Sequence, residues 1–406
     1  MNLPEKKVKE LIDLMNSMST ASIPAQKPII EMFNLAMDEK MLDYLLTIGT
    51  EYHTKDELGA IYHKLYGGNA SDWEGYWKEI ITMSFVHPKS NEERHLYGLS
   101  PIFPGWVEFY TSGPMDEKRA AILEKFMEFW GVLKKLNFGP MRLLSNYKGE
   151  KKVKDGVPPR VSTYVSTGSP IETNPDTAKI ASEQLHTKST KTISMNQLIE
   201  AQQAIHPAGD IYKLLEKNKD EIAVMNCFCR SHKKISSGGS CDFGLPVEGC
   251  ITLGALSRQV VDNGVARHLP YEEAVALMKE FEEKGCIHTA FHYKNDANND
   301  EIVVCNCCVD CCLLYSGYRE GGLSKIFARS FYKPELIDES RCVGCNICAK
   351  YCPTEATYYD KISKKLVFQY EKCIGCGQCV NQCKFDVRKM IKDQRDVFVK
   401  TKKKPK

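Results

Sequence analysis

The sequence predicts an α+β multidomain protein with a helical N-terminal region, a cysteine-rich α+β middle domain and a small C-terminal domain built on a cysteine repeat. The chain has 406 residues, too many for one typical domain. All 18 cysteines follow residue 226, and eight of them form two runs with identical C-x2-C-x2-C-x3-C spacing. We expect a helical domain at 1–145, followed by a connector at 146–200. A cysteine-rich domain at 201–335, a repeat domain at 336–392 and a basic tail at 393–406 complete the chain.

The N-terminal region has helical patterning and no cysteine. Leu11, Met15 and Met18 share one helix face. The segments 54–57 (TKDE) and 71–74 (SDWE) fit the capping-box pattern, so each is expected to open a helix. Two short strands, 85–88 and 95–99, follow around a polar turn at 89–94. Helix, helix and two strands is the order of a winged-helix module, so we expect a winged-helix-like docking domain.

A winged helix also raises the alternative of a redox-responsive DNA-binding regulator. The second predicted helix, at 72–79 (DWEGYWKE), is acidic and aromatic. It lacks the Arg, Lys and Asn side chains that contact phosphates and bases. We therefore expect no nucleic-acid partner.

The middle domain combines a predicted helix with a dense set of thiols. The helix spans 271–284, with Ala274, Leu277, Met278 and Phe281 on its apolar face and Gly285 as its end. Cys286 follows alone and is expected to be a small buried side chain. Nine further cysteines form two groups, too dense for casual core filling: Cys227, Cys229, Cys241 and Cys250, then Cys305, Cys307, Cys308, Cys311 and Cys312.

These nine cysteines are the predicted metal ligands of the middle domain. One zinc ion needs only four ligands, whereas nine thiols suit one or two additional [4Fe-4S] clusters. Zinc and a redox-active thiol pair remain alternatives. Spacing does not assign ligands to sites here, and a vicinal pair such as Cys307-Cys308 can point its thiols apart.

The two regular runs are the most specific motif of the chain. They read Cys342-Val-Gly-Cys345-Asn-Ile-Cys348-Ala-Lys-Tyr-Cys352 and Cys373-Ile-Gly-Cys376-Gly-Gln-Cys379-Val-Asn-Gln-Cys383. A loop with a thiolate at every third residue wraps three corners of a cubane iron–sulfur cluster, and the fourth cysteine reaches the cluster held by the other run. The sequence therefore predicts two [4Fe-4S] clusters.

Residues 342–383 resemble the bacterial two-cluster ferredoxins, which implies a ferredoxin-like fold at the C-terminus. By that resemblance, one cluster is bound by Cys342, Cys345, Cys348 and Cys383, and the other by Cys373, Cys376, Cys379 and Cys352. Pro353 follows the first run as in that family, but Lys384 stands where a second proline is expected.

A broader resemblance, over residues 200–390, is to iron–sulfur ferredoxin fusions of anaerobes. It rests on four segments, 227–230 (CFCR), 272–274 (EEA), 285–288 (GCIH) and 304–308 (VCNCC). This resemblance implies an oxygen-poor setting and supplies no substrate.

Composition and the absence of known catalytic motifs limit the classes of protein to which this chain can belong. The N-terminus lacks an apolar signal-peptide core, and no stretch of eighteen apolar residues occurs, so we expect a protein of the reducing cytoplasm without a membrane span. Net charge is +3, with the positive excess near the C-terminus. No dinucleotide, Walker A, HExxH or GxSxG pattern is found.

The leading hypothesis is an electron-transfer subunit, without catalytic residues of its own, that exchanges low-potential single electrons with a redox partner. That partner is an oxidoreductase, such as a flavoenzyme or metalloenzyme, within a complex. The alternative is an oxidoreductase with a catalytic iron–sulfur cluster in the middle domain.

Overall fold

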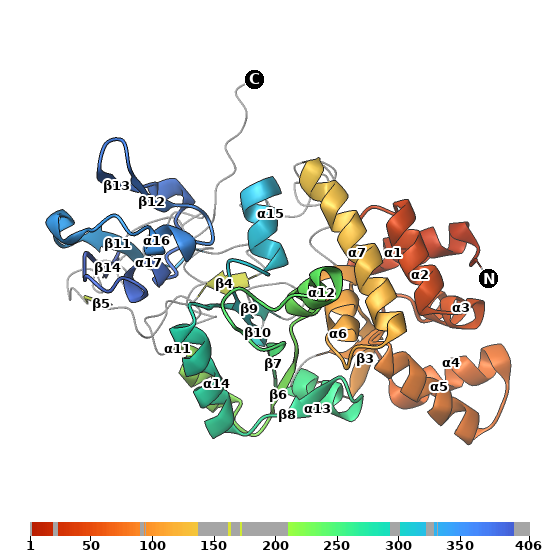
Figure 1. Ribbon diagram of the computed structural model, residues 1–406. Helices are drawn as coiled ribbons and strands as arrows, with labels where there is room; N and C mark the ends of the chain where they lie inside the picture. Colours follow the sequence, from red (N-terminus) through yellow and green to blue (C-terminus); the bar gives the residue numbers. More distant parts are fainter. Residues whose placement is uncertain are drawn as a thin grey trace, which may run out of the picture. The chain divides into compact units, whose positions relative to one another are not determined.

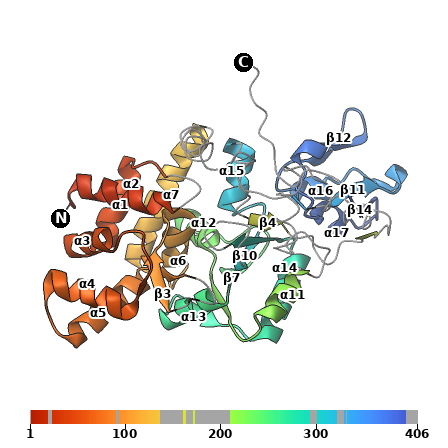
Figure 2. The ribbon, with the colours of Figure 1, turned by 180° about the vertical axis from the view of Figure 1, so that it is seen from behind.

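The computed structural model describes residues 2–18, 23–89, 93, 95–136, 161–163, 171–172, 210–292, 301–321, 329–330 and 332–393 (Figure 1, Figure 2). The chain divides into two compact units. The first comprises 1–152, 220–239 and 247–270, and the second comprises 153–219, 240–246 and 271–406. Both units mix helices with strands, which agrees with the predicted α+β class. Most of the predicted connector at 146–200 lies outside the described residues.

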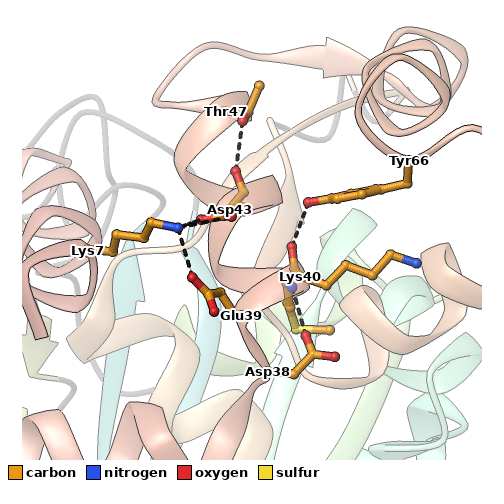
Figure 3. A network of polar contacts seen from close by, with 8 residues as sticks. Lys7, Asp38, Glu39, Lys40, Asp43, Thr47 and Tyr66 are labelled. Carbon is orange, nitrogen blue, oxygen red and sulfur yellow. Dashed lines mark hydrogen bonds and ion pairs between the residues drawn. The ribbon is translucent and has the colours of Figure 1, made fainter. Parts of the chain in front are cut away.

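Three helices begin the first unit: α1 (Glu5–Ser17), α2 (Lys27–Ala36) and α3 (Glu39–Ile48). The apolar face predicted for α1 is buried at Leu11 and Met15. Polar contacts hold α1 and α3 together, because Lys7 Nζ lies 3.0 Å from Glu39 Oε1 and 2.8 Å from Asp43 Oδ1 (Figure 3). Asp38 caps α3 by accepting a hydrogen bond from the Met41 backbone N–H at 2.8 Å.

The next elements include the predicted order of two helices and two strands, preceded by a short strand, β1, that was not predicted. They are β1 (His53–Thr54), α4 (Lys55–Tyr66), α5 (Ala70–Thr82), β2 (Val86–Pro88) and β3 (Leu96–Leu99), and the antiparallel sheet has the order β1-β3-β2. The capping box of Thr54 and Glu57 forms at the start of α4. Residues 90–92 and 94 of the predicted turn lie outside the described residues.

The second capping box differs from the prediction. Asn69 caps α5 and Asp72 completes the box, whereas Ser71 and Glu74 were expected to do so. The two glycines before Asn69 have φ values of +69° and +88°. They turn the chain so that the helix is already formed at Ser71. Asn69 and Asp72 form a box although their residue types differ from the Ser/Thr-x-x-Glu/Gln pattern that Ser71 and Glu74 match.

An aromatic core joins the remaining elements of the first unit. It lies around η1 (Ile102–Trp106), α6 (Val107–Thr111) and α7 (Glu117–Lys135), where Trp106 stacks on Phe85 with ring centroids 4.8 Å apart. Figure 1 shows α7 alongside α2. The later segments add β6 (Ile222–Asn226), α12 (Phe228–Ser237), β7 (Glu248–Leu253), α13 (Ala255–Asp262) and β8 (Ala266–His268), with β6 between β7 and β8.

The second unit has a sheet in the order β4-β9-β10, covered in part by a predicted helix. Its strands are β4 (Val161–Thr163), β9 (Ile287–His292) and β10 (Glu301–Cys307). The predicted helix is α14 (Tyr271–Glu283), with Ala274, Met278 and Phe281 buried as expected. Two further helices of this unit are α11 (Asp210–Lys217) and α15 (Leu313–Gly321).

The C-terminal part of the second unit repeats one local structure after 31 residues. The 3-10 turns η3 (Glu339–Arg341) and η4 (Tyr370–Lys372) precede the short helices α16 (Ile347–Lys350) and α17 (Gln378–Asn381). The strand β11 (Tyr332–Leu336) pairs antiparallel with β14 (Arg388–Lys392), and β5 (Ile171–Glu172) pairs parallel with β14. A hairpin of β12 (Thr357–Asp360) and β13 (Lys365–Phe368) lies between the repeats.

No helix in the described part of the chain is long and apolar enough to span a bilayer.

Gly285, which ends α14, is expected to be intolerant of a side chain. Its φ is +81°, and a Cβ atom there would overlap the Tyr351 ring. Gly264 is a matched control, since its φ is +66° but no atom lies within 4 Å of its Cβ position. Gly264→Ala should cost about 1 to 2 kcal/mol of backbone strain. Gly285→Ala should cost about 1 to 3 kcal/mol more for overpacking.

Scanning calorimetry measures both variants. A larger fall in melting temperature for Gly285→Ala than for Gly264→Ala is expected, and equal falls would contradict the close contact with Tyr351.

Candidate metal centres

The two regular cysteine runs adopt loops of the same conformation. Left-handed backbone occurs at Gly344 and Asn346 in the first run, with φ of +70° and +59°, and at Gly375 and Gly377 in the second, with φ of +76° and +81°. Glycine tolerates this conformation, and asparagine adopts it more readily than most other residues do. The Asn346 side chain is also anchored, because its Oδ1 accepts from the Tyr359 backbone N–H at 2.7 Å. These turns let successive thiols face a common point.

The thiols of the first quartet surround a cavity. Cys342, Cys345, Cys348 and Cys383 line it, together with Cys379 from the second run. Cys345 is exposed and the other three are half-buried, so this centre lies at the surface of its unit.

The second quartet is more deeply buried. Cys352, Cys373 and Cys376 are all buried, and Cys352 packs with Cys373 in one core cluster. Backbone N–H groups point at two of these sulfurs, from Ala356 to Cys352 Sγ at 3.1 Å and from Gly375 to Cys373 Sγ at 3.3 Å. Such donors stabilise thiolates and are one of the ways a protein adjusts a cluster's reduction potential.

Arg388 provides positive charge next to both quartets. Burial raises the pKa of the Cys379 thiol to about 12, while the Arg388 guanidinium opposes this by its charge and by a hydrogen bond to the thiol. Burial also raises the pKa of Cys348, and Arg388 again acts in the opposite direction. Arg388 is itself 4% exposed, so its charge is poorly screened by solvent. The role of Arg388 was not predicted from the sequence, because nothing in its local pattern marks it as a neighbour of the clusters.

Replacing Arg388 with Met should lower the midpoint potential of the clusters. The reduced cluster is more negative and gains more from a nearby cation than the oxidised cluster does. A differential interaction of about 1.4 kcal/mol corresponds to about 59 mV for a one-electron couple, so we expect a shift on the order of tens of millivolts.

Lys389→Met is the control, since it removes one charge from the next residue of β14, whose side chain leaves the other face of the strand. Potentiometric EPR titration compares the two variants. Equal potentials in the Arg388→Met and Lys389→Met proteins would contradict the assigned influence of Arg388.

A third group of thiols forms in the second unit from cysteines far apart in sequence. Cys241, Cys308 and Cys311 have ligand atoms within 4.8 Å of one another, and within the described residues this is the group of three that meets that criterion. The Cys241 and Cys308 sulfurs lie 3.6 Å apart, and the Cys311 backbone N–H donates to Cys308 Sγ at 3.3 Å. These three cysteines form a possible metal site.

The protein around this group fixes its shape. The Asp242 backbone N–H donates to Asp310 Oδ2 at 2.9 Å, which joins the loop carrying Cys241 to the turn carrying Cys311. Lys284 Nζ donates to the Gly244 carbonyl at 3.0 Å and holds the same loop to the end of α14. Cys286 is fully buried, as expected, and packs in the same core cluster as Cys241 and Cys308. Its placement beside them was not predicted.

The other two cysteines of the group at 305–312, Cys305 and Cys312, lie next to Cys307. The Cys307 thiol is hydrogen-bonded to the thiols of Cys305 and Cys312, and these bonds together with burial raise its pKa well above the ordinary value. Burial, and then the nearby thiols of Cys307, Cys312 and Cys376, raise the pKa of Tyr315 in the same direction. Tyr315 is therefore close both to middle-domain thiols and to Cys376 of the second regular run.

Three of the predicted ligands lie in the first unit. Cys227 precedes α12, Cys229 is in its first turn, and Cys250 pairs with Met225 across β6 and β7. Their role as ligands stays a prediction.

His288, which the broader resemblance singles out, has its ring nitrogens near other groups. Its Nδ1 is hydrogen-bonded to Asn306 Oδ1 at 2.6 Å, and its Nε2 lies 3.3 Å from Glu282 Oε1.

Comparison with known proteins identifies one region. Residues 335–384 match the family model described as a 4Fe-4S dicluster domain. No curated protein and no solved structure matches the chain. The dicluster region thus holds two [4Fe-4S] clusters, and the cysteine-rich middle region contains a possible further site at Cys241, Cys308 and Cys311.

Proposed function

We propose that this chain is an electron-transfer protein or subunit that passes low-potential single electrons between a partner oxidoreductase and metal sites of its own middle region. The observation that carries the proposal is the dicluster domain, in which the thiols of Cys342, Cys345, Cys348 and Cys383 line one cavity. Cubane clusters in such a domain exchange one electron at a time. The clusters supply the redox chemistry, and the protein supplies thiolates, hydrogen bonds and a buried cation.

The placement of the thiols supports the crosswise ligand sets implied by the ferredoxin resemblance. Cys383 lines the same cavity as Cys342, Cys345 and Cys348. Cys352 packs against Cys373, and the thiols of Cys352, Cys379 and Cys373 all lie near Cys376. In this assignment, Cys352 and Cys383 each leave their own run to complete the other cluster.

Burial and contacts give the centres an order within the second unit. The first cluster lies nearest to solvent, at exposed Cys345. The second is buried, and Gln378, next to its ligand Cys379, donates a hydrogen bond to the Cys286 carbonyl at 2.8 Å. Cys286 packs with the Cys241 and Cys308 thiols. Electrons would therefore pass from the middle site through the second cluster to the first, or in the reverse direction.

Cys376→Ala should remove the second cluster and interrupt this path. We expect a loss of about four irons, one cubane's content. The rate of partner reduction should fall to background, although the first cluster remains. Iron analysis and stopped-flow absorbance measure the two effects. Partner reduction at the normal rate in this variant would show that electrons do not use the C-terminal pair.

The partner is proposed to dock at the solvent-facing side of the first cluster. Val343 and Phe385 line that cavity and are 62% and 39% exposed, so both offer apolar surface beside this cluster. Apolar groups that become buried at the centre of an interface contribute most of its affinity. The partner chemistry that fits is a redox protein with an apolar patch beside its own cofactor.

Val343→Asp should weaken docking while leaving the iron content unchanged. The control is Ile362→Asp, because Ile362 is 94% exposed in the β12–β13 hairpin and does not line the cavity. The concentration dependence of reduction of the partner recovered from the native host measures docking. We expect a fall in apparent affinity of about tenfold or more for Val343→Asp, since a lost contact of about 1.4 kcal/mol has that effect. The same loss in both variants would place the docking surface elsewhere.

A further inference from the structure

We infer that the C-x-C-C-x2-C-C motif at residues 305–312 serves two separate metal sites, one with Cys308 and Cys311 and the other with Cys305, Cys307 and Cys312. The inference deepens the proposed function and rests on it for the redox role of the sites. The adjacent cysteines Cys307 and Cys308 thus bind at different sites, and so do Cys311 and Cys312. The ligand chemistry of both is soft thiolate, which suits an iron–sulfur cluster or a single tetrahedral metal ion.

Strand geometry places the side chains of Cys307 and Cys308, the first two adjacent cysteines of the motif, on different sides. Side chains alternate between the two faces along β10, so Cys305 and Cys307 share one face while Asn306 points to the other. The contacts of Asn306 identify its face, because it binds His288, whose other nitrogen contacts Glu282 of α14. The thiols of Cys305 and Cys307 therefore leave the face away from α14.

Contacts on that far face agree with the alternation. Thr289 is paired with Cys305 across β9 and β10, so the two side chains point to the same side. The Thr289 hydroxyl lies 3.3 Å from Cys307 Sγ. The Cys307 thiol is in turn hydrogen-bonded to the Cys305 and Cys312 thiols. The Cys307 thiol thus has the Cys305 and Cys312 thiols as neighbours, on the side opposite His288.

Cys308 returns to the side of α14. It is 2% exposed and packs with Phe281 of α14 and with Cys286, which follows that helix. The turn after β10 then brings the Cys311 backbone N–H to Cys308 Sγ at 3.3 Å. Cys241 completes the group of three, with its sulfur 3.6 Å from that of Cys308.

Cys286 is the fourth thiolate proposed for the site on the α14 side. It is 0% exposed and shares a core cluster with Cys241 and Cys308. Four thiolates complete the coordination of a structural zinc ion or of a cubane cluster. Neighbouring side chains on opposite faces of a strand point away from each other, so Cys307 and Cys308 do not share one metal in this arrangement.

The test compares Cys307→Ser with Cys308→Ser in the full chain, purified without oxygen and reconstituted with iron and sulfide or with zinc. Iron, zinc and sulfide content and EPR spectra measure what each variant loses. We expect the two variants to lose the metal and the EPR signal of different sites, and the double variant to lose those of both sites. Cys286→Ser should match Cys308→Ser, and Cys305→Ser should match Cys307→Ser.

Two separate sites are ruled out if both single variants lose the same metal and the same EPR signal, and if the double variant loses no more metal than either single variant. The inference is also overturned if neither variant loses metal. Retention of the dicluster EPR signals shows that a variant is folded. Absence of those signals from the wild-type protein would count against the proposed function instead, while metal content would still report on the two sites.

Alkylation of wild-type protein gives a second readout that needs no variant. As metal is withdrawn by a chelator, thiols should become reactive in two groups, Cys241, Cys286, Cys308 and Cys311 in one and Cys305, Cys307 and Cys312 in the other. Mass spectrometry of the labelled peptides resolves the order. Simultaneous exposure of Cys307 and Cys308 at every stage would contradict two independent sites.

Discussion

Bonds between cysteine thiolates and metal are the interaction on which the second unit depends. The dicluster region has little apolar core of its own. One of its core clusters consists of Tyr332, Val380 and Met390 with Cys379 packed against them, and another of Cys352, Ala356 and Cys373. Cysteines are part of both, so loading with iron completes the interior as well as the redox centre. Metal binding free energy is folding free energy in such a region.

Charge is the second consequence of this thiolate chemistry. Four thiolates on an oxidised cubane leave a net charge of about −2, which must be stabilised within the protein. Backbone N–H groups at Cys352 and Cys373 and the guanidinium of Arg388 provide that stabilisation. Both N–H groups serve the buried second quartet, and Arg388 lies next to thiols of both quartets. The same groups that make burial tolerable would thus also set the driving force for electron transfer along the proposed path.

Short-range patterns predicted the elements that depend on local chemistry. The repeat spacing predicted the dicluster domain, and apolar periodicity with a terminal glycine predicted α14. The capping pattern at Thr54 was right, but that at Ser71 was displaced, since a glycine turn decides where α5 begins. Arg388 and Cys286 acquire their importance only from long-range packing, which no local pattern records. The separation of Cys307 from Cys308 becomes definite only when Cys305–Cys307 is known to be a strand.

We propose that the chain carries metal in its middle region in addition to the two clusters of the dicluster domain. The decisive measurement is the amount of iron, inorganic sulfide and zinc per chain in protein purified without oxygen from its native host. We expect about eight irons for the dicluster domain, four per cubane, together with further iron and sulfide or with zinc. About eight irons and eight sulfides with no other metal, and freely reactive thiols at Cys241, Cys308 and Cys311, would contradict it.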